Sequence, residues 1–171
     1  MKYVLLVVGL VLFSVESYSQ GGRIKGSRFA QLGVGFTGAG PLISGYGGLS
    51  FDQRIKGYFG GGVGIGNDAD IQYKYIFLDG IGSFNLRSVN RFFYFNALAG
   101  VSFAGDLINK FPNDVNTNQF SFNYGVLGGC EAEFYVSRNF AFVLTGTQRY
   151  YLRQEFGNWR YQVTAGVRLI L

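Results

Sequence analysis

Apolar and polar residues alternate with a period of two in two long segments of the chain. In residues 120–136 the even positions are mostly aromatic or aliphatic, and the odd positions are mostly polar or small. In residues 160–171, Tyr161, Val163 and Ala165 lie on one face, and Gln162 and Thr164 on the other. A period of two indicates a β-strand, and these segments are long enough to cross a membrane as strands.

Weaker alternation predicts six further strands, which makes eight, an even number as in bacterial outer-membrane barrels. In the segment 71–85 the alternation is only partial, and we expect a β-bulge near Leu78 and Asp79. Short basic turns are predicted at residues 53–56, 87–91 and 137–139, and longer connections at 38–45 and 104–119. The six segments are residues 29–37, 46–52, 58–66, 71–85, 92–103 and 140–153.

This pattern predicts an all-β fold, an eight-stranded antiparallel up-and-down transmembrane β-barrel. The first residues, MKYVLLVVGLVLFSVESYSQ, resemble a secretory signal peptide, with Lys2 before a short apolar run and small residues at Ser17 and Ser19. We expect cleavage before Gln20, so that residues 1–19 are a signal peptide and residues 20–171 form the barrel. An uncleaved anchor is the alternative for the same segment.

Alternation alone does not say whether the apolar face points outward into lipid or inward, as in a soluble lipocalin-like ligand-binding barrel. Charged residues make up only 15% of the chain, and there are 18 Phe and 12 Tyr, too many large rings for a narrow lumen. The polar face is mainly Gly, Ser, Thr, Asn and Gln, which suits a crowded interior. Aromatic residues also gather at expected strand ends, as in membrane-interface girdles: Tyr58 and Phe59, Phe92 and Phe93, Phe134 and Tyr135, Tyr150 and Tyr151, Trp159 and Tyr161.

Little in the chain suggests catalysis. It has no histidine, the commonest general base and metal ligand, and its one cysteine excludes an intrachain disulfide. The G-x-G-x-x-G match at residues 33–38 lies within an expected strand, whereas a dinucleotide site needs a turn that opens a helix. We therefore expect no catalytic, cofactor-binding or metal-binding residues, and a protein that is not an enzyme.

A polar cluster is expected inside the barrel. If the turn at 137–139 pairs residues 136 and 140, Glu131 lies opposite Thr145. If Gln154 pairs with Trp159, Thr145 lies opposite Arg168. Glu131, Thr145 and Arg168 then form one inward row with Glu133 close by, and Arg168 pairs with the glutamates, because an unpaired buried charge is costly.

The net charge is +5, and the cations are scattered rather than gathered into a basic patch. We therefore expect no direct nucleic-acid binding. Several cations fall at the predicted short turns, where they either hold lipid headgroups or form a docking surface for another protein. These are Arg54, Lys56, Arg87, Arg91 and Arg138.

The last fifty or so residues resemble the TraO family of conjugative-transposon transfer proteins. The resemblance is carried by the stretches YGVLGG at 124–129, EFYVSR at 133–138, QR at 148–149 and AGVR at 165–168, and by PLI at 41–43. It implies a small outer-membrane barrel with a role in mating-pair DNA transfer and no assigned catalytic residues.

Three hypotheses of function follow. The first is a non-enzymatic structural or interaction component of a conjugative DNA-transfer apparatus in the outer membrane of a Gram-negative bacterium, with membrane lipid and other transfer proteins as partners. The second is a stand-alone outer-membrane barrel for adhesion or membrane integrity. The third is the soluble lipocalin-like barrel.

Overall fold

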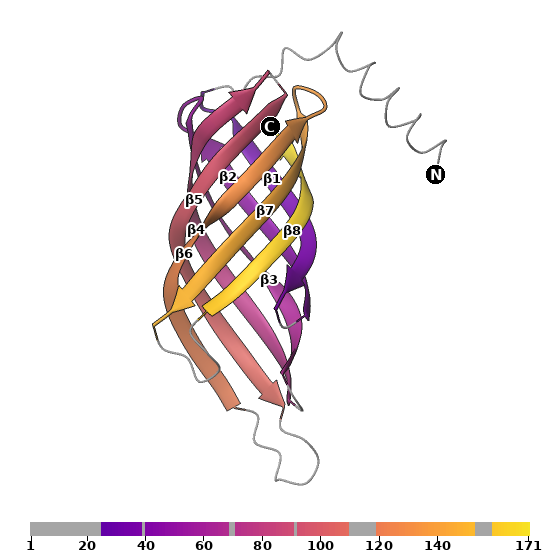
Figure 1. The fold of residues 1–171 in the computed structure, drawn as a ribbon, viewed down its shortest axis with the longest axis vertical. Coiled ribbons are helices and arrows are strands. Elements are labelled where there is room, and N and C mark those ends of the chain that lie inside the picture. The colour runs from indigo at the N-terminus through magenta and orange to yellow at the C-terminus, as the bar shows by residue number, and fades with distance from the viewer. Residues whose placement is uncertain (1–24, 39, 69–70, 91, 110–118, 153–158) are drawn as a thin grey trace, which may run out of the picture.

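The β1–β8 pairing closes the sheet into a barrel in the computed structural model, which describes residues 25–38, 40–68, 71–90, 92–109, 119–152 and 159–171. Each strand pairs antiparallel with its neighbours in chain order, as Figure 1 shows. This confirms the predicted eight-stranded barrel. The signal peptide expected at residues 1–19 lies outside the described residues. The strands are β1 (Arg28–Thr37), β2 (Gly40–Ser50), β3 (Ile55–Asp68), β4 (Ile71–Val89), β5 (Phe93–Asn109), β6 (Gln119–Tyr135), β7 (Phe140–Tyr151) and β8 (Trp159–Ile170).

The two ends of the barrel differ. The turns between β2 and β3, β4 and β5, and β6 and β7 lie at the end where β1 begins and β8 finishes, which we call the turn end. The other connections lie at the opposite end, the loop end; those at residues 38–39 and 69–70 are short, and those at 110–118 and 153–158 are the longest between strands of the barrel. Outer-membrane barrels have short periplasmic turns and longer extracellular loops. The turn end is therefore the periplasmic end.

Side chains alternate between an apolar outer surface and a buried interior. In β1, Leu32, Val34 and Phe36 are each more than 60% exposed, whereas Phe29 and Gln31 are buried. The same alternation holds in β6 and β8, as the sequence predicts. None of the described residues forms a helix with the length and apolar character of a membrane span. An outer wall of exposed Leu, Val, Ile and Phe is stable in hydrocarbon and not in water, which rules out the soluble barrel.

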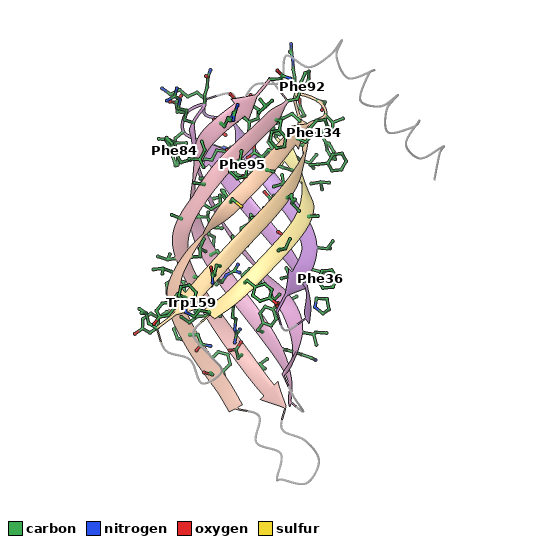
Figure 2. The ribbon with its side chains drawn as sticks, viewed as in Figure 1. Phe36, Phe84, Phe92, Phe95, Phe134 and Trp159 are labelled. Carbon is green, nitrogen blue, oxygen red and sulfur yellow. The ribbon has the colours of Figure 1, made fainter. Side chains whose placement is uncertain are left out.

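Outward aromatic rings gather at two levels of the barrel (Figure 2). Phe84, Phe95 and Phe134 lie near the turn end, and Phe36 and Trp159 lie toward the loop end. The expected girdles are therefore present, but not every predicted member belongs to them. Three of the predicted rings point into the lumen and are buried, namely Tyr58, Tyr135 and Tyr151.

Strands β4, β5 and β6 have 19, 17 and 17 residues, longer than the 10 of β1 or the 12 of β8. A tilted strand needs only about 9–11 residues to cross the bilayer core. At the loop end these three strands continue past β1, β2, β7 and β8 (Figure 1), and β3 reaches as far as β4, because Asp68 pairs with Ile71 at the start of β4. They therefore extend the wall beyond the outer girdle.

The prediction of a bulge near Leu78 and Asp79 is wrong. Pairing with β5 is regular there, and the register shifts between Asn85 and Arg87. Tyr75, Phe77 and Ile81 point inward on the same face as Asp79. Apolar residues therefore occupy both faces of this strand. In the sequence this looks like an interrupted alternation, although the strand pairs regularly here.

Four predicted connections have other bounds than expected. Residues 40–45 belong to β2, where Pro41 lies before the pairing with β3 begins at Leu42, an edge position that tolerates proline, and 104–109 belong to β5. Asp106 resembles a loop residue in the sequence but points inward and pairs with Arg160. Strand β3 begins at Ile55, and Arg87 lies within β4.

We expect Leu144→Arg, in the middle of β7, to lower the free energy of unfolding by about 2–4 kcal/mol, because Leu144 is 55% exposed on the lipid-facing wall. The same change at Val89, beside the turn end, should cost at most about 1 kcal/mol. Denaturant titration in phospholipid vesicles measures both, with the single tryptophan, Trp159, as the fluorescent reporter. Equal costs at the two positions would show that the outer wall does not lie in hydrocarbon.

Candidate functional site

The largest group of buried charges lies inside the barrel near the turn end, and we call it the turn-end network. It contains Glu131 and Glu133 of β6, Arg168 of β8 and Lys56 of β3. Each occupies an inward position of its strand, and none is more than 1% exposed. Closure of the barrel brings these strands around one narrow space.

Arg168 and Lys56 both contact both glutamates. Arg168 Nη2 lies 2.8 Å from Glu131 Oε2, and Arg168 Nη1 lies 2.5 Å from Glu133 Oε1. Lys56 Nζ lies 3.3 Å from Glu131 Oε1 and also pairs with Glu133. Two cations thus offset two carboxylates within one buried layer, which removes most of the cost of burying either pair alone.

Neutral side chains complete the network. Asn96 Nδ2 donates to Glu131 Oε1 at 3.1 Å and to Glu133 Oε1 at 2.9 Å. Tyr58 Oη donates to Glu131 Oε2 at 3.2 Å, and Arg168 Nε donates to Gln31 Oε1 at 3.0 Å. The Arg168 guanidinium also lies 4.5 Å from the centre of the Phe29 ring. These partners hold the charged groups in one arrangement.

Two further ion pairs fill the lumen toward the loop end. Arg149 Nη2 lies 2.6 Å from Asp79 Oδ2, and Tyr46 Oη donates to the same carboxylate oxygen at 3.0 Å. Arg160 Nη1 donates to Asp106 Oδ1 at 2.9 Å, and Arg160 Nη2 donates to Asp106 Oδ2 at 2.6 Å. Arg149 and Arg160 also lie beside the Phe77 and Tyr75 rings.

Charge in the lumen therefore sums to zero over the described residues. The cations are Lys56, Arg149, Arg160 and Arg168, and the carboxylates are Asp79, Asp106, Glu131 and Glu133. The interior of an eight-stranded barrel is just wide enough for side chains to fill it. Within the described residues no group of three His, Cys, Asp or Glu is placed to hold a metal ion.

The sequence-predicted row is only partly assembled. Glu131 lies opposite Thr145, but Thr145 lies opposite Thr164, not Arg168, so the predicted β7–β8 register is wrong. Tyr150 pairs with Trp159, which makes the connection longer than we assumed, and connection length sets the register of a hairpin. Arg168 reaches the glutamates across the lumen. Thr145 Oγ1 has no hydrogen-bond partner among the described residues.

Sequence reasoning missed Lys56 and the neutral partners of the turn-end network. Lys56 was expected on a periplasmic turn, but it lies inside β3 and is 1% exposed, so it is not a docking residue. The sequence does carry a signal for this position. Lys56 lies two residues before Tyr58, which is also buried, and residues two apart in a strand share a face. Asn96 and Gln31 were not singled out because their charged partners come from distant strands.

The remaining turn cations do lie at the turn end. Arg54 and Arg138 are exposed in turns, and Arg87 is exposed near the end of β4. Arg91 lies outside the described residues. Of the cations predicted at the turns, Arg54, Arg87 and Arg138 therefore lie on the surface, and Lys56 lies buried in the lumen.

Comparison with solved structures yields the same architecture. The β-barrel domain of OprF from Pseudomonas aeruginosa superimposes with a TM-score of 0.62 at 16% identity, covering 86% of this chain and 98% of that domain. A major outer membrane protein of Thermus thermophilus gives 0.65 at 12% identity, covering 85% and 99%. Ail, the attachment invasion locus protein of Yersinia pestis, gives 0.56 at 10% identity, covering 86% and 100%.

The chain has the fold of small outer-membrane β-barrels. No protein-family model matches its sequence, and no curated protein does. The likeness extends over nearly the whole of each solved barrel but, at such low identity, concerns the fold alone. Together with the apolar wall and the two girdles, it places the barrel in the outer membrane of a Gram-negative bacterium.

We expect Arg168→Leu to lower the free energy of unfolding by about 3–5 kcal/mol, because among the described residues it leaves Lys56 as the one cation paired with two buried glutamates. Denaturant titration in vesicles measures the loss. Arg138→Leu, on an exposed turn, is the matched control and should change stability by no more than about 0.5 kcal/mol. Wild-type stability of Arg168→Leu would contradict the network.

We also expect the purified barrel to show no steady conductance in planar bilayers, since side chains fill a lumen of this size. The double variant Asp79→Ala with Arg149→Ala removes one pair from the lumen and keeps its charge at zero. Any leak should be larger in that variant than in the native protein. Reproducible channels formed by the native barrel would refute the sealed lumen.

Proposed function

We propose that this protein is a non-enzymatic outer-membrane scaffold that acts by contact rather than by transport. The observation that carries the proposal is the lumen, where four cations and four carboxylates are paired inside the barrel. A barrel filled in this way passes no large solute, and DNA least of all, since porins need about 16–18 strands for an aqueous channel. Partners then meet its rims or its outer wall.

The apparatus we propose for it is that of conjugative DNA transfer. The support is the resemblance to the TraO family in the stretches 124–129, 133–138 and 165–168. In the structure these stretches lie in β6, the turn that follows it, and β8. Two of them also contain Glu133 and Arg168 of the turn-end network. The resemblance thus falls on residues that hold the barrel together as well as on its periplasmic rim.

The proposed docking surface is the basic periplasmic rim formed by Arg54, Arg87 and Arg138. All three are exposed at the turn end, the face that meets periplasmic proteins. An acidic surface on a transfer protein would complement them. The competing role for the same cations is to hold lipid headgroups, which predicts an effect on insertion rather than on transfer.

A stand-alone role in adhesion or membrane integrity is the second candidate, and one observation favours it. Strands β4, β5 and β6 continue past the outer girdle at the loop end (Figure 1). A wall raised on one side offers an external contact surface that a purely periplasmic scaffold does not need.

We expect deletion of the gene from a donor strain to lower conjugation frequency without slowing growth. Complementation with the triple reversal Arg54→Glu, Arg87→Glu and Arg138→Glu should restore the barrel but not transfer. The matched triple change to Lys keeps the charge and should restore both. Conjugation frequency reports transfer, and faster gel migration of the unboiled protein reports assembly.

Two results would contradict this scheme. Normal transfer by the deletion strain would remove the conjugation role and leave the stand-alone barrel. Loss of assembly in the Glu variant but not in the Lys variant would assign the rim cations to lipid headgroups.

A further inference from the structure

An apolar groove runs across the outer wall of the barrel, on strands β7, β8, β1, β2, β3, β4 and β5. Its volume is about 840 Å³, within the range of about 300–1,000 Å³ typical of small-molecule sites. Its walls are outward side chains that are more than half exposed, among them Val34, Ile43, Val63 and Ile76. The groove therefore faces lipid, not the lumen.

Inward glycines account for the hollow. Gly60, Gly62 and Gly64 of β3 all point into the lumen, where Tyr46, Phe77 and Tyr75 occupy the space that their side chains would need. A Cβ at Gly64 would lie 2.2 Å from the Tyr75 ring, and one at Gly62 would lie 2.7 Å from the Phe77 ring. Without these side chains β3 can lie close to the lumenal rings beneath the groove, which Gly64 also lines.

One cation belongs to the groove. Lys74, near the loop end of β4, is exposed on the outer wall and lines the groove beside Ile65 and Leu107. In the described part of the chain it has no ion-pair partner, in contrast to the cations of the lumen. Phe36, which also lines the groove, belongs to the outer aromatic girdle (Figure 2). The ammonium group therefore lies toward the level of lipid headgroups, and the apolar floor lies at the depth of acyl chains.

We propose that this groove is a binding site for an anionic, phosphate-bearing lipid of the outer leaflet. One acyl chain lies along the floor formed by Val34, Ile43 and Val63, and the Lys74 ammonium contacts the phosphate. Because the wall faces hydrocarbon, an unfilled groove would deprive both the protein and the surrounding lipid of dispersion contacts. A flexible acyl chain that fills the groove restores these contacts. The Lys74 ammonium at the outer end of the groove, which has no ion-pair partner among the described residues, selects for negative charge.

The test is native mass spectrometry of the barrel released from bilayers of equal phosphatidylglycerol and phosphatidylcholine. The native protein should retain phosphatidylglycerol in preference. Lys74→Gln should reduce that preference about fivefold, as expected for one lysine at an anionic surface. Arg28→Gln removes an exposed cation from the turn end of β1, away from the groove, and should leave the preference unchanged.

A second pair of variants tests the apolar floor. Ala165 lines the groove and points outward, so Ala165→Phe should fill part of it and lower the amount of retained lipid of either kind. Ala99→Phe adds the same ring to the outer face of β5, away from the groove, and should not. Faster migration of unboiled protein on gels verifies that each variant is folded.

Three outcomes would overturn the proposal: no lipid retained by the native barrel, equal losses in Lys74→Gln and Arg28→Gln, or retention in Ala165→Phe equal to that in Ala99→Phe. Capture of a second copy by a Val63→Cys cross-link in a Cys130→Ser background would assign the groove to dimerisation instead. None of these results bears on conjugation frequency, so the lipid site and the transfer role fail independently.

Discussion

Backbone hydrogen bonding in hydrocarbon is the constraint on which this structure depends. Lipid offers no partner for an open strand edge, so a sheet that crosses a membrane must close on itself. The β1–β8 pairing from Phe29 with Ile170 to Thr37 with Gln162 meets that requirement. Closure then divides every strand between two surroundings, lipid outside and tightly packed side chains inside. The period of two in the sequence follows directly from this division.

The interior is subject to an electrostatic constraint, namely the pairing of buried charges. Charged groups in a narrow lumen are far from bulk water, and each needs a partner of opposite sign. The turn-end network satisfies this with two cations shared between two glutamates, and the loop-end half satisfies it with two separate arginine pairs. Since the lumen is occupied by these contacts, the surfaces left for function are the two rims and the outer wall.

Those surfaces are not equivalent around the barrel. Strands β4, β5 and β6 rise past the outer girdle, whereas β1, β2, β7 and β8 end near it. The lipid-facing groove crosses the shorter strands and continues over β3 and β4, where inward glycines make room for the rings of Tyr46, Tyr75 and Phe77. The barrel therefore has an extended wall at the loop end and a groove on its lipid-facing surface. The basic rim of Arg54, Arg87 and Arg138 supplies a third surface on the periplasmic face.

The sequence by itself determined the strand number, the order of the strands and which face of β6 and β8 meets lipid, because alternation is a local property that two neighbouring residues already display. It also determined that Glu131 lies opposite Thr145, since the short turn before β7 leaves one register. Only the tertiary structure decided that Lys56 and Asn96 join Glu131 and Glu133, that Asp79 pairs with Arg149, and that Thr145 faces Thr164. These contacts join strands that are far apart in the chain, and their geometry depends on the tilt and closure of the whole barrel. No local pattern encodes which inward side chains meet across a lumen.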